Sequence, residues 1–336
     1  MAEKKTGWLY EISFMRPILL VLLVSYHAFA PFCGAWEMPQ GIEANEVYKW
    51  LAYLSYSFLL EAFVFLSGYI FTMQIIKKQK YKSLTQVAYS KFKHLIIPCW
   101  IFGIVYYLLF SKGQSLFLVL NGIGHLWYLP CLFWCSLAIY STSNLEKKYG
   151  VNEKLQFVCF IVCMAMSVIY IPFQINRALY YCFFFYLGGL FWRYNNRLTL
   201  KANAKNIILL VVSFIALLIF VNLFNESHTN VGMVYKIIKV MLKAILATTG
   251  ITMLYLIASK FTHKHTLSQT VMTIGTMGYG VYIFHQFILK YLYYYTPLPE
   301  AVGTAALPWV AGGGTLIASL LTTYLFKSTK IGRTLI

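Results

Sequence analysis

Long apolar stretches separated by short polar segments make up most of the chain. A helix that crosses the hydrocarbon core of a bilayer, about 30 Å thick, needs roughly 20 apolar residues. Ten stretches meet this requirement, at residues 13–33, 51–76, 94–111, 126–143, 155–173, 178–194, 206–224, 236–258, 274–293 and 305–326. The pattern therefore predicts an all-α, polytopic membrane protein with about ten transmembrane helices.

The polar segments between these stretches predict no second domain. The longest of them, at about residues 34–50 and 77–93, are too short to fold alone. Of the 336 residues, 60% are hydrophobic and 11% are charged, whereas a soluble domain has about 25% charged residues. We therefore expect a single integral membrane domain over residues 1–336.

Loops that are rich in Lys and Arg alternate along the chain with loops that contain few of them. Loops on the cytoplasmic side of a membrane protein carry an excess of Lys and Arg. With the N-terminus inside, 20 of these residues fall on the cytoplasmic side and six on the other, namely Lys49, Lys112, Arg177, Lys236, Lys239 and Lys290. The split predicts that both termini are cytoplasmic. It also explains the formal net charge of +18 by topology and contact with anionic lipid, so no nucleic-acid partner is expected.

Three ionisable residues in the first two predicted helices point to a functional site. Such groups are costly within a membrane and usually mark function. Arg16 and His27 are eleven residues apart in one helix, which places them within about 20° of the same face and roughly 16 Å apart along the axis. Glu61, in the second helix, is expected at a depth similar to that of His27. A neighbouring carboxylate would orient the imidazole and stabilise its protonated form. The alternative for Glu61 is a buried carboxylate paired with Lys49 or with another helix.

Five segments, in this order along residues 12–290, resemble motifs of the membrane acyltransferase-3 family. They are Arg16 followed after ten residues by His27, Glu-Ala-Phe-Val-Phe-Leu-Ser-Gly-Tyr at 61–69, Ser-Lys-Phe-Lys-His-Leu-Ile-Ile-Pro at 90–98, His-Leu-Trp-Tyr-Leu at 125–129, and Tyr-Gly-Val-Tyr-Ile-Phe-His at 279–285. The chain has Lys91 and Lys93 where the family usually has arginine, and Glu61 where aspartate is commoner.

The resemblance implies transfer of an acyl group, usually acetyl from acetyl-CoA, to a hydroxyl group of a carbohydrate. The acceptor would be a polysaccharide, a lipid-linked sugar or another envelope glycan, and the location a bacterial inner membrane. His27 would be the catalytic base, Glu61 its orienting acid and Arg16 the essential arginine. Phosphates of the donor would be bound by Arg16, Lys91 and Lys93, although simple anchoring at the cytoplasmic surface also explains the two lysines.

Four further residues are candidates for binding the acceptor. Trp127 and Tyr128 could stack on a sugar, but aromatic residues at the membrane interface are equally expected as anchors. His125 shares that ambiguity. His285 is a candidate as well, although Gln286 and nearby tyrosines favour a structural role. Lys243, in the eighth predicted helix, is expected to extend its amine toward the interface. No metal site is expected, because the pair His263 and His265 offers too few ligands.

Two other classes of function compete with the enzyme. A transporter or flippase for a glycan or lipid intermediate would use the same charges as a substrate path. Such proteins often contain paired repeats or helices interrupted by Gly and Pro, and neither is seen in this sequence. A polytopic scaffold or sensor would need a receiver domain, which the sequence also lacks. The acceptor, the acyl group and the oligomeric state are not determined by the sequence.

Overall fold

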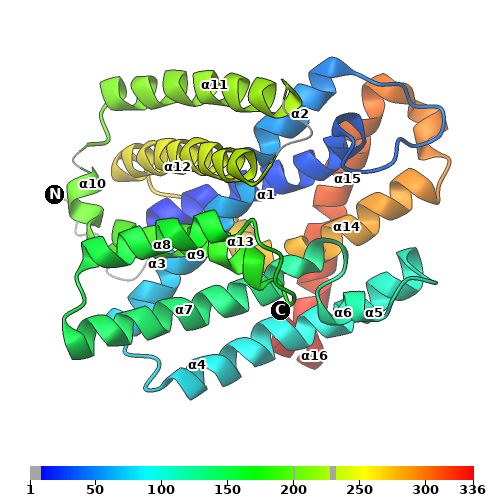
Figure 1. Cartoon of the computed structure of the whole chain (residues 1–336). Helices are drawn as coiled ribbons and strands as arrows, with labels where there is room; N and C mark the ends of the chain where they lie inside the picture. The colour runs from blue at the N-terminus through cyan, green and yellow to red at the C-terminus, as the bar shows by residue number, and fades with distance from the viewer. Residues whose placement is uncertain (1–8, 200, 228–231) are drawn as a thin grey trace. The chain divides into compact units, whose positions relative to one another are not determined.

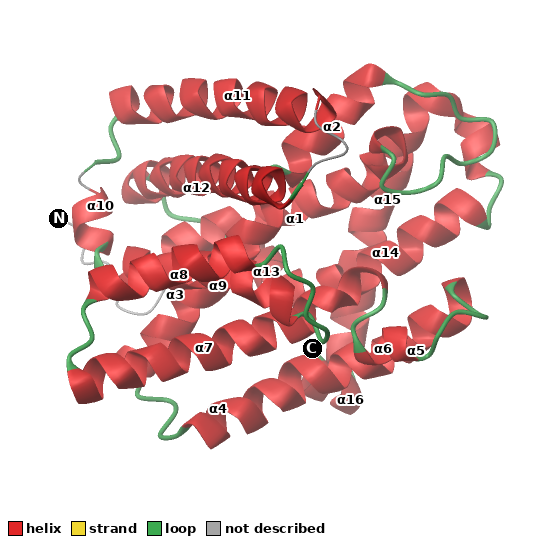
Figure 2. Cartoon of the chain, viewed as in Figure 1, coloured by secondary structure: helices red, strands yellow, loops and turns green. Residues whose placement is uncertain are grey.

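A computed structural model describes residues 9–199, 201–227 and 232–336 (Figure 1). All regular structure in these described ranges is helical (Figure 2). The α-helices are α1 (Tyr10–Phe29), α2 (Glu46–Tyr56), α3 (Leu59–Ile76), α4 (Leu84–Lys91), α5 (Ile97–Phe110), α6 (Phe117–Leu120), α7 (Tyr128–Tyr149), α8 (Glu153–Met166), α9 (Ile175–Arg193), α10 (Asn195–Thr199), α11 (Ala204–Ser227), α12 (Met233–Lys264), α13 (Gln269–Thr276), α14 (Gly278–Tyr294), α15 (Leu298–Ser328) and α16 (Lys330–Leu335). Two 3₁₀ segments, η1 (Ala30–Cys33) and η3 (Gly124–Trp127), and a π-helical segment, η2 (Phe92–Ile96), complete the set.

Six helical segments are long and apolar enough to cross a bilayer. They are Tyr10–Cys33, Glu46–Ile76, Leu84–Phe110, Ala204–Ser227, Met233–His263 and Leu298–Ser328, within the described part of the chain. Each contains most of one of the predicted spans. The other four predicted spans correspond to α7, α8, α9 and α14, which are helical but fall outside this group. The all-α class is therefore confirmed, whereas the count of ten and the side of each terminus stay predictions.

Three of the predicted helices are interrupted or end early. The helix predicted at 51–76 is divided at Ser57 and Phe58 into α2 and α3. The helix predicted at 155–173 ends at Met166, since residues 167–174 form turns around Pro172. Phe173 and Gln174 have φ angles of 58° and 61°, which a helix cannot continue through. The helix predicted at 274–293 is divided by a turn at Met277 into α13 and α14. Apolar composition hides such breaks, because it continues through them.

The helices divide into two compact units. The first comprises the described parts of residues 1–59, 196–222 and 246–328. In it, α1 packs against α2, α13, α14 and α15. Ala28 of α1 approaches Gly312 of α15 so closely that a Cβ atom at Gly312 would lie 3.1 Å from the Ala28 Cβ. The hydroxyl of Tyr293 in α14 donates a hydrogen bond of 2.5 Å to the Ala28 carbonyl, which fixes α14 at the C-terminal end of α1.

The second unit comprises the described parts of residues 60–195, 223–245 and 329–336. Its centre is a close crossing of α3 and α9 at Gly68 and Gly188. A Cβ atom at Gly68 would lie 1.9 Å from the carbonyl oxygen of Phe185, and one at Gly188 would lie 2.0 Å from that of Phe65. Only glycine permits backbones to approach this closely, and small residues serve this purpose between membrane helices.

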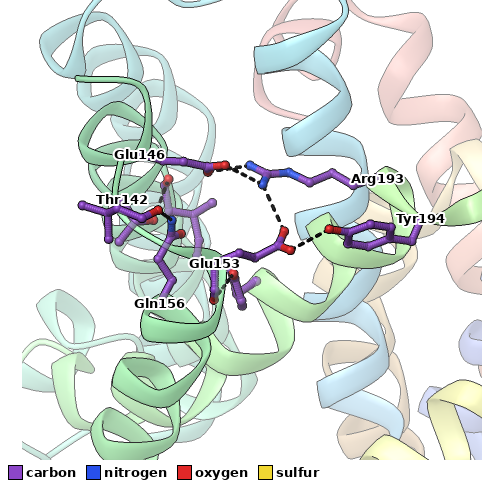
Figure 3. Close-up of polar contacts among 9 residues, drawn as sticks. Thr142, Glu146, Glu153, Gln156, Arg193 and Tyr194 are labelled. Atoms are coloured by element: carbon purple, nitrogen blue, oxygen red, sulfur yellow. Dashed lines mark hydrogen bonds and ion pairs between the residues drawn. The ribbon is translucent and has the colours of Figure 1, made fainter. Parts of the chain in front are cut away.

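Arg193, at the C-terminal end of α9, ties the ends of α7, α8 and α9 together (Figure 3). Its guanidinium donates two parallel hydrogen bonds of 2.9 Å to the carboxylate of Glu146 and a third, of 3.2 Å, to Glu153. The Tyr194 hydroxyl donates to Glu153 at 2.7 Å. The hydrogen bonds from Arg193 lower the pKa of Glu146 below its usual value.

Candidate active site

The imidazole of His27 is half-buried near the C-terminal end of α1 and is enclosed by aromatic and polar groups of the first unit. The Trp36 ring lies 5.3 Å from it, centroid to centroid, with 22° between the planes. The His285 ring lies 4.9 Å away at 42°. The ring of His27 is therefore held by packing on more than one side while part of it stays accessible.

A tight turn brings Trp36 back to His27. The 3₁₀ segment η1 follows α1 and is terminated by Gly34, the residue after it, whose φ of 74° lies in the left-handed region that glycine adopts without strain. The backbone N–H groups of Ala35 and Trp36 then donate to the carbonyl of Ala30, at 3.1 and 3.4 Å. This turn reverses the chain within a few residues, so a tryptophan nine positions beyond His27 lies against its ring.

Gln286 of α14 contacts the same imidazole. Its amide nitrogen lies 3.1 Å from Nε2 and 3.4 Å from Nδ1 of His27. If the amide nitrogen lay along the in-plane lone pair of one ring nitrogen, it would be much farther from the other ring nitrogen. If it lay in the ring plane at similar distances from both ring nitrogens, it would collide with Cε1. The amide therefore lies over the face of the imidazole, and the in-plane lone pair of the ring does not point at it.

His285 is fully buried, and its tautomer is fixed. Its Nδ1–H donates to the carbonyl of Val281 one turn earlier in α14, at 3.0 Å. Because the ring is 0% exposed and packs on His27, the structure favours the structural role that the sequence suggested. A direct contact of His285 with the acceptor stays a prediction.

Arg16 lies on the same helix as His27, as predicted, and its side chain is half-buried. Gly275 of α13 packs on its aliphatic part, since a Cβ atom there would lie 3.6 Å from both Cβ and Cδ of Arg16. Among the described residues, no ion pair or hydrogen bond engages the guanidinium of Arg16. An arginine placed in this way is suited to an anionic ligand, because charge-assisted hydrogen bonds to the anion offset the free-energy cost of removing the guanidinium from water.

Glu61, in the second unit, has partners that the sequence did not indicate. Its Oε1 lies 3.2 Å from Nζ of Lys243 in α12 and accepts a hydrogen bond of 3.0 Å from the Tyr180 hydroxyl in α9. The expectation that Lys243 extends toward the interface was therefore wrong, because its amine pairs with a fully buried carboxylate. Pairing with another helix was one of the two alternatives for Glu61. Its predicted role beside His27 stays a prediction, because the two residues belong to different units.

Lys91 and Lys93 flank Phe92 where α4 passes into the π-helical segment η2. Lys93 is exposed, whereas Lys91 is half-buried with its Nζ 4.9 Å from the centroid of the Phe71 ring. The charges of both lysines and of Lys80 act on His94, so these residues form one basic group. Single-turn π-helical segments are rare and often occur at functional sites.

The predicted acceptor-binding residues His125, Trp127 and Tyr128 lie together at the start of α7. His125 and Tyr128 are buried, and Trp127 is half-buried. The guanidinium of Arg177 stacks on the Trp127 ring, 4.0 Å from its centroid. The Tyr181 ring lies 5.9 Å from Trp127. Trp127 is half-buried and the exposed Arg177 stacks on it, so Trp127 is the member of this group best suited to contact a ligand.

The structure brings several of the predicted residues into contact and adds partners to them. His27 and His285 meet in the first unit, where the contacts of Trp36 and Gln286 with His27 had not been predicted. Glu61 lies in the second, where Tyr180 and Lys243 had not been linked to it. One signal was available for Gln286 and Lys243, because each is a polar residue in an otherwise apolar predicted helix. No sequence signal singles out Trp36 from the other tryptophans.

An all-helical chain with long apolar helices and ionisable side chains packed among them is typical of a polytopic membrane protein. Residues 9–327 match the family of acyltransferase domains known as acyltransferase-3, and because this is nearly the whole chain, the protein belongs to that family. It is therefore an integral membrane acyltransferase, which binds an acyl donor and an acceptor. No curated protein matches the chain, and neither does any solved structure. In the described residues, no group of three or more His, Cys, Asp or Glu side chains could hold a metal ion.

Proposed function

We propose that this protein transfers an acyl group, expected to be acetyl, from cytoplasmic acyl-CoA to a hydroxyl group of an envelope glycan or a lipid-linked sugar. The observation that carries the proposal is the arrangement on α1. A half-buried histidine is held by Trp36, His285 and Gln286, and the same helix carries Arg16 without a partner among the described residues.

His27 would act as the general base in this reaction. The acceptor hydroxyl must lose its proton as it attacks the thioester, and a correctly placed imidazole accelerates such a step by about 10²–10⁴-fold. Glu61 would stabilise the imidazolium that forms, as proposed from the sequence. Packing around His27 supports this role, because it keeps the ring in one orientation without covering it completely.

The donor would bind through its phosphates. Arg16 offers a planar guanidinium for bidentate contact, and Lys91 and Lys93 offer point charges. All three are expected on the cytoplasmic side of the bacterial inner membrane, where acyl-CoA is found. The acceptor would meet the aromatic group around Trp127, since the apolar face of a sugar stacks on such rings.

The proposal is tested with the purified protein in proteoliposomes. They are supplied with isotopically labelled acetyl-CoA and with envelope glycans from cells that lack the protein. We expect release of free CoA thiol together with labelled ester in the glycan, detected by mass spectrometry, and neither product with His27→Gln. A protein that moves the glycan across the bilayer without consuming acyl-CoA would instead be a transporter, and the proposal would be wrong.

A further inference from the structure

We infer that the acceptor glycan carries a negative charge and that Arg177 binds this charge, which rests on the proposed function and deepens it by naming the chemical class of the acceptor. The charge is a carboxylate of an acidic sugar or a phosphate within the glycan. A planar guanidinium binds either group through two parallel hydrogen bonds. Arg177 is then a residue that determines specificity and takes no part in the chemical step.

The guanidinium of Arg177 is exposed and lies on the half-buried ring of Trp127, with its Cζ atom 4.0 Å from the ring centroid. A distance this short favours a stacked arrangement, because an N–H group directed at the ring would hold Cζ farther from it. Stacking uses the face of the guanidinium and leaves the N–H groups at its edge. Within the described residues, these N–H groups take part in no hydrogen bond or ion pair. Arg177 therefore presents its donors outward from a supported position.

No carboxylate of the second unit compensates the charge of Arg177. The acidic residues of this unit are Glu61, Glu146, Glu153 and Glu226. The first three pair with Lys243 or Arg193, and no ion pair joins the fourth to Arg177. Arg177 lies in the first turn of α9, which also lacks an acidic residue, although the positive end of the helix dipole favours one there. An anion at this position is therefore attracted without competition from a carboxylate of the protein.

The two turns that present Trp127 and Arg177 are joined to each other. The side-chain amide of Gln174 donates to the carbonyl of Asn121 at 2.8 Å, which ties the start of α9 to the turn before Trp127. Phe173 and Gln174 both have positive φ angles, which residues other than glycine rarely adopt. Such conformations persist where the surrounding structure enforces them, and they occur often beside binding sites. Arg177 and Trp127 are therefore held in a fixed relation.

Arg177 lies apart from the basic group proposed for the donor. Nζ of Lys91 lies 4.9 Å from the centroid of the Phe71 ring, and that ring packs on Phe185 of α9 at 5.5 Å. Phe185 is eight residues beyond Arg177 in the same helix, which is about 12 Å along the axis. The two basic groups therefore meet α9 at different depths, and the sequence predicts opposite sides of the membrane for them. The ligand of Arg177 is accordingly not the phosphates of CoA.

A charged glycan suits this position better than a lipid headgroup does. Recognition of anionic lipid typically uses clusters of several Lys and Arg residues. Arg177 is instead the only basic residue between positions 155 and 192. The half-buried ring of Trp127 beneath it adds apolar surface on which a sugar can pack. One arginine on an aromatic ring therefore matches a sugar that bears a single charged group.

The test removes the charge from either partner. Full-length protein in phosphatidylcholine proteoliposomes is given acetyl-CoA and the envelope glycan fraction of cells that lack the protein. The fraction is used untreated, with its carboxyl groups reduced to alcohols, or dephosphorylated. We expect the KM of wild type for the glycan to rise about tenfold in one treated fraction, which identifies the charged group. Arg177→Met should show the same rise with the untreated fraction and no further change with the treated ones. Its kcat and its KM for acetyl-CoA should stay within about threefold of wild type.

Two further variants and a binding measurement complete the test. Lys112→Met is the matched control, because Lys112 is also an exposed basic residue on the predicted outer side, and its KM for the glycan should not change. Arg177→Lys keeps the charge and loses the planar fork, so it should show a smaller rise, of about threefold. Fluorescence polarisation of the labelled, untreated fraction measures glycan binding without turnover, and Arg177→Met should bind about tenfold more weakly than wild type.

Three results would overturn the inference while leaving the proposed function intact. They are a wild-type KM that is the same for all three fractions, a folded Arg177→Met protein with the KM of wild type, and a defect of Arg177→Met that appears only when phosphatidylglycerol is added to the vesicles, which would assign Arg177 to lipid. If Arg177→Met does not fold, the treated fractions and Arg177→Lys decide. A wild-type protein that transfers no acyl group would refute the proposed function. The binding measurement would then decide the inference, since equal binding by wild type and Arg177→Met would overturn it.

Discussion

Lys243 and Glu61 form an ion pair across α12 and α3, with Nζ of the lysine 3.2 Å from Oε1 of a carboxylate that is 0% exposed. Tyr180 donates to the same oxygen at 3.0 Å. In the described residues, no group hydrogen-bonds to the second oxygen, Oε2, although it is buried. Removing one partner from such a pair leaves an uncompensated buried charge, which is far more costly than removing both.

Lys243→Met should therefore destabilise the protein by about 2 kcal/mol or more, after allowance for the partial exposure of Lys243. The measurement is the thermal unfolding temperature in detergent. Lys243→Arg should retain most of the stability, and Glu61→Gln combined with Lys243→Met should be more stable than Lys243→Met alone. A Lys243→Met protein as stable as wild type would show that the ion pair contributes nothing to stability.

His27→Gln should abolish acyl transfer while leaving folding and acyl-CoA binding largely intact. Glutamine keeps hydrogen-bonding groups of similar size, but it cannot accept a proton. His27→Ala should be equally inactive. Glu61→Gln should cost less, because it removes the stabilising charge and not the base. Turnover and acetyl-CoA affinity are measured on the same preparations. A folded His27→Gln protein with near-normal turnover would refute the proposed mechanism and make His285 or His125 the next base to test.

Combined replacement Lys91→Ala and Lys93→Ala should weaken acetyl-CoA binding roughly five- to thirtyfold, because each of the two charge contacts is expected to contribute about 0.5–1 kcal/mol. The affinity of the variant should also depend less on salt, because attraction to phosphate is screened. Calorimetric titration at low and high salt measures both effects. The matched control is Lys77→Ala with Lys78→Ala, which removes the same charge from the same predicted side. Equal losses in the two variants would indicate a general surface effect.

Cysteine labelling should confirm the predicted topology. Single cysteines at positions 40, 80, 150 and 330 are introduced after the seven native cysteines have been replaced. A reagent that does not cross the membrane should label position 40 from outside the cell and label the other three only after permeabilisation, since the basic loops are expected inside. Labelling of position 330 from outside would exclude an even number of spans with a cytoplasmic N-terminus.

The contribution of the Arg193–Glu146 contact to stability should be lost in acid. Because the pKa of Glu146 is lowered in the folded state, its contribution is present above the pKa of the unfolded chain and is lost as pH falls through the folded value. Wild type should be more stable than Arg193→Gln at neutral pH, and the difference should shrink from about pH 5 downward. Unfolding temperatures measured across this range provide the test. A difference that does not change with pH would mean that Glu146 does not titrate with folding.

The sequence by itself determined the class of the fold and the positions of most helices. Lipid requires continuous apolar stretches of nearly fixed length, and such stretches are visible in the local order of residues. The shared face of Arg16 and His27 follows from the helical repeat alone. Breaks inside apolar stretches, at 57–58, at 167–174 and at Met277, were missed because the residues that form them are mostly apolar, so the hydropathy pattern continues through them.

Only the tertiary structure decided which side chains meet. Gln286 contacts His27 although the two residues are 259 positions apart in the chain. Glu61 is paired with Lys243 and Tyr180, whereas the sequence offered Lys49 as a candidate partner. Hydropathy places a helix in the membrane, but it does not choose the neighbours of that helix. Those are set by close packing at small residues such as Gly68 and Gly188 and by the few polar groups that need partners in an apolar medium.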